Sequence, residues 1–293
     1  MSTQQTAKTQ YIDVKGIKVA YRLFGAKTGV PLLFNQHFRG TMDHWDPLLI
    51  NSLAKSRSIL LYDNYGVGKS GGDVPGSCAE WAEVGINLVK ALGIKQVDVF
   101  GFSMGGMVAQ MIALNSPEIT RRVIIGGSSP SYGEGIIAGP EWPFPKLMNA
   151  STPEESKDAF LSTFYTHSEK KQKLGEEWWA RINERTEDRS DYLNPEQTAR
   201  QAGAVGKWFS PDHVDSGSYN RLHEIKIPVL VVNGDNDIIV PTENSIVLFR
   251  QLQKANSNAH LYLYPDTGHG FLNEYAELFA AHVTLFLDTD RVV

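Results

Sequence analysis

The most reactive arrangement in this sequence is a serine between two glycines. Residues 101–105 follow the pattern Gly-x-Ser-x-Gly, with Ser103 at the centre. A mostly apolar run before them predicts a short buried strand, and the apolar residues after them recur at helical spacing. A serine at such a strand-to-helix turn is held in a strained, exposed conformation. The pattern therefore predicts a nucleophilic Ser103, with the backbone N–H of Met104 at a helix N-terminus, where it can stabilise an oxyanion.

A serine hydroxyl is a weak nucleophile at neutral pH and needs a histidine to accept its proton. Among eight histidines, His269 follows a strand-like segment at 260–264 and stands between two glycines in a loop. Such a loop can carry the side chain up to the edge of a sheet. His260 and His282 lie inside periodic segments, where a structural histidine is the commoner finding. We therefore predict His269 as the base.

The histidine in turn needs a carboxylate to orient it. A buried-strand pattern at 227–232 is followed by a loop with two aspartates, Asp235 and Asp237. Asp235 directly follows a glycine in a tight turn and is expected to cap local backbone N–H groups. Asp237 lies further along, where the loop can reach over the sheet toward the histidine. Asp237 is the predicted acid, and Asp235 is the alternative.

With these residues in place, the chain resembles the α/β-hydrolase superfamily over nearly its whole length apart from a middle insertion. The order Ser103, Asp237, His269 is the order of that superfamily. The matching segments lie at 31–40, 61–70, 101–106, 234–241 and 268–269. The resemblance is closest to the branch of small esterases, lactonases and cofactor-free haloperoxidase-like enzymes. It implies a mostly parallel central sheet with helices on both faces and an inserted helical cap.

One segment departs from the family pattern. Members usually carry His-Gly after the third core strand, and the next residue donates the second oxyanion N–H. The corresponding residues here are Gln36 and His37, so the resemblance assigns this donor to Phe38. Losing the glycine removes backbone freedom where the chain must turn sharply. Gln36 and His37 either bind substrate through their side chains or pack as structural polar residues.

Strand-like runs alternate with helical segments along most of the chain. After a predicted antiparallel hairpin at 11–25, these runs lie at 31–35, 58–62, 97–101, 122–127, 228–233 and 260–264. Their alternation with helices predicts an α/β fold with a largely parallel sheet covered on both faces. Ser77 and Glu80 have the spacing of a capping box, which predicts a helix from there to Leu92.

Residues 132–221 interrupt this alternation. They are rich in aromatic and charged residues, and their apolar residues fall at helical intervals without convincing strands. We predict that they form a helical cap, inserted into a core made of residues 1–131 and 222–293. Most of the cap's aromatic residues must form its own small core. A few are expected to face Ser103, and Trp142 is a candidate for substrate binding.

Composition limits the kinds of partner. The chain has 293 residues, a net charge of −5 and no long basic block, which argues against nucleic acid. Its one cysteine, Cys78, excludes an internal disulfide and fits a reducing compartment. The N-terminus is polar, and no segment has the length of a membrane span. These features predict a soluble cytoplasmic protein that acts on a small molecule, without a nucleic-acid or membrane partner.

No cofactor or metal is predicted. The stretch 66–71 satisfies Gly-x-Gly-x-x-Gly, but the next helix starts only near Ser77, which disagrees with a Rossmann turn. A P-loop would need glycine where the chain has Asp63. Paired histidine or cysteine metal-ligand motifs are lacking.

The leading hypothesis is a serine hydrolase that cleaves a carboxylic ester or a lactone. The same three residues could instead serve perhydrolysis, amide cleavage or carbon–carbon bond hydrolysis. A third hypothesis, from another class, is a small-molecule receptor on the hydrolase fold, because a fold alone does not decide function.

Overall fold

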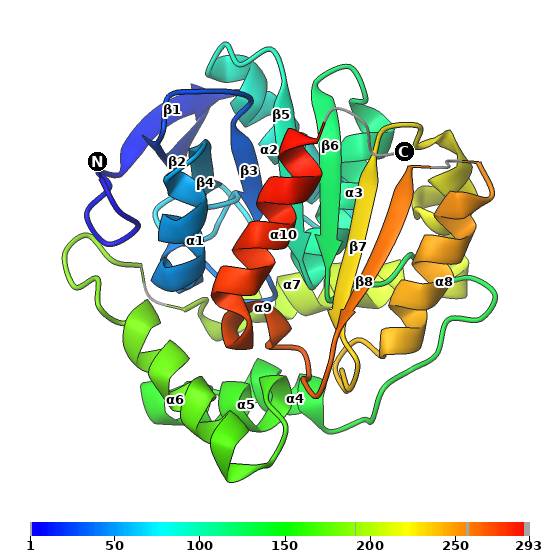
Figure 1. The fold of residues 1–293 in the computed structure, drawn as a ribbon. Helices are drawn as coiled ribbons and strands as arrows, with labels where there is room; N and C mark the ends of the chain where they lie inside the picture. The colour runs from blue at the N-terminus through cyan, green and yellow to red at the C-terminus, as the bar shows by residue number, and fades with distance from the viewer. Residues whose placement is uncertain (1, 191, 256–257, 290–293) are drawn as a thin grey trace.

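The strands of the protein form one eight-stranded sheet (Figure 1). The structure is a computed structural model that describes residues 2–190, 192–255 and 258–289. They are β1 (Gln10–Val14), β2 (Ile17–Gly25), β3 (Leu32–Asn35), β4 (Ser58–Tyr62), β5 (Val97–Phe102), β6 (Thr120–Gly126), β7 (Val229–Gly234) and β8 (Ala259–Tyr264). Their spatial order is β1-β2-β4-β3-β5-β6-β7-β8. Only β2 pairs antiparallel, with β1 and β4, and the remaining pairs are parallel. The predicted α/β-hydrolase fold class is confirmed.

Helices cover both faces of this sheet. They are α1 (Pro47–Ala54), α2 (Cys78–Ala91), α3 (Met104–Asn115), α4 (Pro143–Asn149), α5 (Pro153–Phe164), α6 (Glu169–Ile182), α7 (Pro195–Trp208), α8 (Thr242–Gln253), α9 (Phe271–Glu274) and α10 (Ala276–Asp288), with short 3-10 helices at Met42–His44, Pro211–Ser216 and Tyr219–Glu224. Apolar residues of α2, α3 and α8 pack on one face of the sheet, and those of α1 and α10 pack on the other. Among the described residues, no helix combines the length and apolar character that crossing a membrane requires.

Local sequence signals explain the first hairpin and the start of α2. The predicted hairpin forms, and its turn residues Lys15 and Gly16 both have positive φ, at 51° and 84°. Only one of the two hydrogen bonds of the predicted capping box forms. The Ser77 hydroxyl accepts the Glu80 N–H at 3.3 Å, but the Glu80 carboxylate accepts the N–H of Gly76 at 2.6 Å rather than that of Ser77. The carboxylate therefore caps the chain one residue further upstream than the box pattern predicts.

Helices α4 to α7 lie between β6 and β7 in the sequence and gather at the end of the sheet where the parallel strands finish (Figure 1). Phe160 and Phe164 of α5 pack against the nearly fully buried Trp178 of α6. The Phe164 ring also lies 4.9 Å from the ring of His269, in the loop after β8. These helices fall where the sequence predicts a cap, and the limits of that cap as a domain, residues 132–221, stay a prediction.

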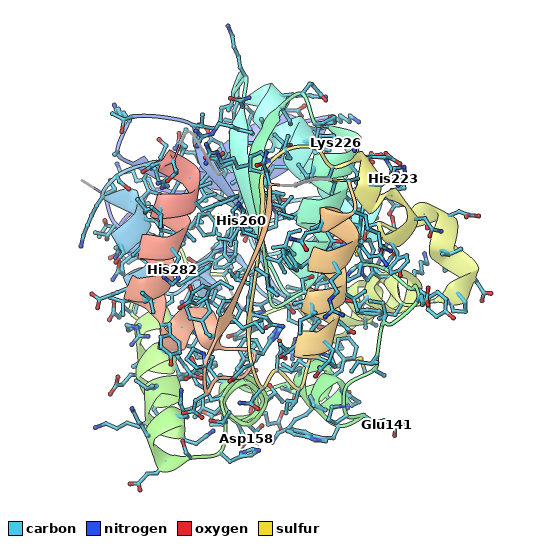
Figure 2. The ribbon with its side chains drawn as sticks, turned by 45° about the vertical axis from the view of Figure 1, so that its right-hand side comes forward. Glu141, Asp158, His223, Lys226, His260 and His282 are labelled. Carbon is cyan, nitrogen blue, oxygen red and sulfur yellow. The ribbon has the colours of Figure 1, made fainter. Side chains whose placement is uncertain are left out.

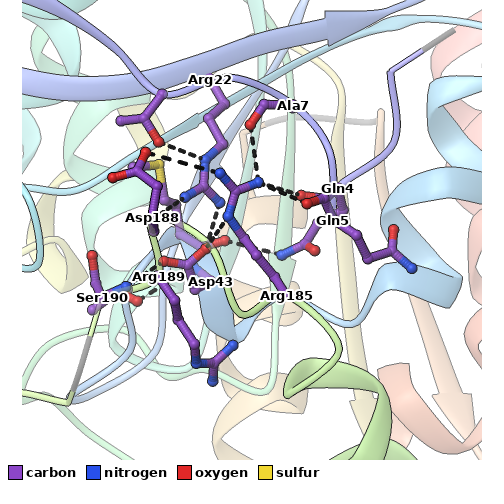
Figure 3. A network of polar contacts seen from close by, with 12 residues as sticks. Gln4, Gln5, Ala7, Arg22, Asp43, Arg185, Asp188, Arg189 and Ser190 are labelled. Atoms are coloured by element: carbon purple, nitrogen blue, oxygen red, sulfur yellow. Dashed lines mark hydrogen bonds and ion pairs between the residues drawn. The ribbon is translucent and has the colours of Figure 1, made fainter.

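Buried charged groups join this cap to the core. Asp43 and Arg22 form a completely buried ion pair, and the second carboxylate oxygen of Asp43 accepts the backbone N–H of Ser190 at 2.8 Å (Figure 3). Arg181 of α6 donates to Asp46, the N-cap of α1, at 2.7 Å. Arg22 belongs to β2 of the core, so Asp43 is linked to the cap through the Ser190 N–H and through Arg185, whose Nε lies 3.5 Å from the carboxylate. Because the carboxylates of Asp43 and Asp46 are buried, breaking these links to the cap is costly.

Replacing Asp43 with asparagine should lower the free energy of unfolding by about 3–5 kcal/mol, because it leaves the Arg22 guanidinium buried without its counter-charge. Urea unfolding at neutral pH measures this loss. The matched control is Asp158→Asn on the outer side of the cap, where the Asp158 carboxylate pairs with Lys146 but is 71 % exposed (Figure 2). That change should cost less than about 1 kcal/mol. Equal losses for the two variants would contradict the buried-charge argument.

Candidate active site

Ser103 occupies the turn between β5 and α3 in a strained backbone conformation, with φ 58° and ψ −121°. Two glycines make this turn possible. A Cβ on Gly101 would lie 1.9 Å from the carbonyl oxygen of Gly105, and a Cβ on Gly105 would lie 2.0 Å from the carbonyl oxygen of Asn35. The spacing seen in the sequence is therefore a steric requirement, because β5, α3 and the end of β3 meet here with no room for side chains.

His269 and Asp237 are hydrogen-bonded to each other. The Nδ1 atom of His269 lies 2.6 Å from Oδ2 of Asp237, and both side chains are buried. The other carboxylate oxygen accepts the N–H groups of Ile239 and Val240 at 2.9 and 3.0 Å. An ionised carboxylate only accepts, so Nδ1 carries the hydrogen and Nε2 carries the lone pair of the neutral ring. Nε2 is buried and has no hydrogen-bond partner within the described residues.

The other acid and histidines considered from the sequence lie elsewhere. Asp235 is exposed, and its carboxylate accepts the N–H of Thr267 at 3.1 Å, so it caps the loop after β8 and not its own turn as predicted. His260 lies on β8 and His282 on α10 (Figure 2). The Nδ1 atom of His282 shares a hydrogen bond with the Tyr264 hydroxyl at 2.8 Å. None of these three groups lines the cavity that contains Ser103.

The loop after β3 closes on itself through Gln36. The Gln36 amide donates to the carbonyl of Thr41 at 3.0 Å, and its oxygen accepts the N–H of His37 at 2.8 Å. A Cβ on Gly40 would lie 2.2 Å from Cγ of Gln36, so the closure also requires that glycine. The positive φ of this loop, 65°, falls on Arg39 and not on His37, where the family pattern has its glycine. Gln36 thus packs as a structural residue outside the cavity.

His37 lies inside the cavity as a neutral ring. Its Nδ1 lies 2.8 Å from the carbonyl of Phe38, which only accepts, so Nδ1 is the donor and Nε2 is an acceptor. Burial lowers the pKa of His37 to about 4, against aromatic neighbours that include Phe160 and Phe164. Nε2 is buried and unpartnered within the described chain. His37 therefore offers an uncharged acceptor at neutral pH.

One cavity of about 500 Å³ brings the central groups together. It is lined by Ser103, His269, His37 and the two residues with predicted oxyanion N–H groups, Met104 and Phe38. In the described residues, neither of these N–H groups has a hydrogen-bond partner. The rest of the wall is mainly apolar and includes Ile136, Ile137, Phe144, Leu147, Phe160, Phe164, Ala202, Val205 and Phe209.

The predicted substrate-binding residue Trp142 is absent from this wall. Its side chain is 43 % exposed, and Phe144, two residues further along at the start of α4, lines the cavity in its place. The sequence offers no signal that separates these two aromatic residues, because they lie two positions apart on either side of the start of a short helix. No group of three His, Cys, Asp or Glu side chains in the described residues is placed to hold a metal ion.

Comparisons with known proteins identify the family of the chain. The model of the Alpha/beta hydrolase family matches residues 37–282. An alpha/beta hydrolase fold protein from Chitinophaga pinensis superposes with a TM-score of 0.85 and 36 % identity, covering 98 % of this chain and 100 % of that one. A 2-hydroxymuconate semialdehyde hydrolase from Pseudomonas putida is 29 % identical, covering 80 % of this chain and 78 % of the relative. A non-heme haloperoxidase from Rhodococcus erythropolis is 26 % identical, and the match covers 94 % of this chain and 97 % of the relative.

The chain therefore belongs to the α/β-hydrolase family, and the hydrolase class predicted from its sequence is confirmed. The relatives differ in the bonds that their names imply, so the family alone leaves the substrate open.

Gly105→Ala should lower the free energy of unfolding by at least about 2 kcal/mol, because the new methyl group collides with the backbone of Asn35. Gly203→Ala in α7 is the control, since its methyl group meets no atom within 4 Å and alanine favours a helix. Denaturant unfolding of both variants checks the difference. A tolerated Gly105→Ala would show that β3 and α3 can separate at this point.

Proposed function

We propose that this chain is a serine hydrolase that cleaves a carboxylic ester or a lactone through an acyl-enzyme. The observation that carries the proposal is the 2.6 Å hydrogen bond between Asp237 and His269, together with the fact that His269 and the strained Ser103 line the same cavity. The bond leaves the unprotonated Nε2 of His269 free to accept a proton. A nucleophile, a base and a group that orients the base are the three parts that acyl transfer requires.

In the proposed acylation step, Oγ of Ser103 bonds to the substrate carbonyl carbon while its proton passes to Nε2 of His269. The carbonyl oxygen becomes an oxyanion, which the free N–H groups of Met104 and Phe38 stabilise. Collapse of this intermediate breaks the bond to the alcohol oxygen, and Nε2–H returns the proton to the leaving group. Asp237 keeps the ring in the required tautomer and stabilises its positive charge in the meantime.

Deacylation repeats these steps with water as the nucleophile. Nε2 of His269 accepts a proton from water, the new carbon–oxygen bond forms, and Ser103 leaves with the proton that Nε2 gives back. The products are a carboxylic acid and a free Ser103 hydroxyl. In a lactone, acid and alcohol stay in one molecule.

The cavity supports a mostly apolar substrate. Phenylalanines of α4 and α5 and aliphatic residues of the 136–140 loop and α7 supply most of its wall. The Nε2 atom of His37 is a fixed acceptor in this wall and would favour a substrate with one hydroxyl or N–H group beside the acyl carbon. The names of the relatives also support the alternatives of perhydrolysis and carbon–carbon bond hydrolysis by the same residues.

Replacing Ser103 with alanine should reduce kcat/KM for ester hydrolysis by about 10⁴-fold or more, because no other group can form the acyl-enzyme. The assay uses p-nitrophenyl esters of increasing acyl length and several lactones. Ser216→Ala, which replaces an exposed serine, is the control for differences between protein preparations and should leave the rate unchanged. Ester turnover that survives in Ser103→Ala would contradict the proposal, and no turnover by the wild type would favour another bond type.

Asp237→Asn and Asp235→Asn form a matched pair, because the two side chains lie two residues apart in one loop. Asp237→Asn should reduce kcat by about 10⁴-fold, since an amide can hold the ring of His269 in the wrong tautomer. Asp235→Asn changes only a cap on Thr267 and should leave kcat close to that of the wild type. Steady-state kinetics with one ester measures both. A larger effect at Asp235 would reverse the assignment of the acid.

A further inference from the structure

A second cavity, of about 710 Å³, lies between the cap helices and the loop that carries Arg39. Its wall includes Arg39, His44, Trp179, Arg189 and Tyr192, together with the first turns of α5 and α7. No described residue lines both this cavity and the one that contains Ser103. The mechanism proposed above uses none of these groups.

Two arginines give the second cavity its charge. Arg39 is 7 % exposed, donates to the carbonyl of Leu147 at 2.6 Å, and keeps a buried Nε without a partner. Arg189 donates to the carbonyl of Ile182, and Figure 3 shows its side chain directed away from the Arg22–Asp43 pair. Neither arginine forms an ion pair with a described carboxylate, and no described residue of the wall is Asp or Glu. A buried cation without a counter-charge is costly unless an anion joins it.

Neutral donors belong to residues of the same wall. The N–H of Thr41 donates to Nδ1 of His44 at 2.9 Å, so the hydrogen of the neutral His44 ring is on Nε2. His44 is 3 % exposed, and its Nε2 has no partner within the described residues. The hydroxyl groups of Ser190 and Tyr192 are likewise buried and unpartnered. These unused polar atoms all belong to residues that line the cavity.

Two helix N-termini add to the positive potential. The first turn of α5, at Pro153 and Ser156, and that of α7, at Pro195 and Thr198, both form part of the wall. The positive ends of the helix dipoles therefore point toward the cavity region. Glu155 caps the start of α5 through the N–H groups of residues 151 and 152, but its carboxylate is exposed and outside the wall.

Aromatic rings form an apolar side of the cavity. The rings of His44 and Tyr192 stack at 3.8 Å, and Trp179 lies parallel to Tyr192 at 9°. Met148 and Leu193 extend this surface. A ligand that matches the whole cavity needs an anionic end for the arginines and a planar or apolar body for the rings.

We propose that the second cavity binds an organic carboxylate with an apolar body. Its carboxylate lies against Arg39 and Arg189 and accepts the hydrogen of His44 Nε2, and its body packs on Tyr192 and Trp179. Charge-assisted hydrogen bonds from two arginines supply both affinity and selectivity for the anion. The proposal goes beyond the hydrolase reaction, since binding requires no turnover.

The test is titration with 4-phenylbutanoate, compared with the uncharged 4-phenylbutan-1-ol, by calorimetry and by tryptophan fluorescence. No tryptophan is among the described residues that line the catalytic cavity, whereas Trp179 lines the second one. Because Trp179 also contacts Phe160 of the catalytic cavity, the fluorescence change is assigned by the variants of Arg189 and Arg200. The acid should bind at least about tenfold more tightly than the alcohol, because charged hydrogen bonds contribute more than neutral ones. Equal binding of acid and alcohol would overturn the proposal.

Arg189→Gln should weaken binding of 4-phenylbutanoate at least about tenfold, and Arg189→Lys should restore most of it. Arg200→Gln is the matched control, because Arg200 is an exposed arginine of α7 outside the cavity. Melting temperatures show whether each variant folds. Trp179→Phe should remove the fluorescence change but keep the calorimetric affinity.

Ser103→Ala should bind the acid as tightly as the wild type, so a failed hydrolase assay leaves this test intact. Two results together would overturn the proposal: Arg189→Gln binds the acid as tightly as the wild type, and the acid competes with ester substrates. They would place the acid in the catalytic cavity.

Discussion

The close crossing of β5 and α3 at Ser103 is the constraint on which the site depends. A Cβ on residue 101 would collide with the carbonyl of residue 105, and a Cβ on residue 105 would collide with the carbonyl of Asn35 at the end of β3. The same contact that strains Ser103 therefore sets the loop after β3 beside the start of α3. In this way one steric arrangement places the proposed nucleophile, Ser103, and both N–H groups of the proposed oxyanion hole, Met104 and Phe38.

Buried charges then fix the cap above this crossing. Asp43 and Asp46 in the core meet Arg22, Arg185 and Arg181, and Glu274 beside the His269 loop meets Lys171 of α6 at 2.6 Å. Exposed ion pairs would allow the cap to shift at little cost, whereas breaking a buried pair leaves an uncompensated charge. These buried pairs thus hold in place the cap whose helices α4, α5 and α7 supply part of the apolar wall around Ser103.

The sequence predicts best what local sterics and hydrogen bonding dictate. The turn at Ser103 has a pattern because only small residues fit there. The preference for Asp237 over Asp235 rests on a detail that is wrong, because Asp235 caps the N–H of Thr267 in another loop, whereas Asp237 accepts the N–H groups of Ile239 and Val240 in its own turn. The cavity wall has no such pattern, since Trp142 and Phe144 differ only in the direction that the tertiary fold gives them. Likewise, the positive φ of this loop lies at Arg39 and not at His37 because the Gln36 side chain closes the loop onto the backbone of Thr41. The spacing of residues in the sequence does not reveal such a contact.

The loop after β3 also explains how position 37, which is glycine in the family pattern, can be histidine here while the fold is kept. Gln36 closes the loop from inside, and Arg39 takes up the left-handed backbone, a conformation that non-glycine residues hold only when their surroundings enforce it. Here α7 enforces it, because Gln201 accepts the N–H of Arg39 at 2.7 Å, and α4 binds the guanidinium through Leu147. Phe38 and Arg39 are adjacent, yet they face different cavities. The cap therefore supports the loop of the proposed oxyanion hole through Arg39, and it also forms the wall of the cavity that contains Ser103.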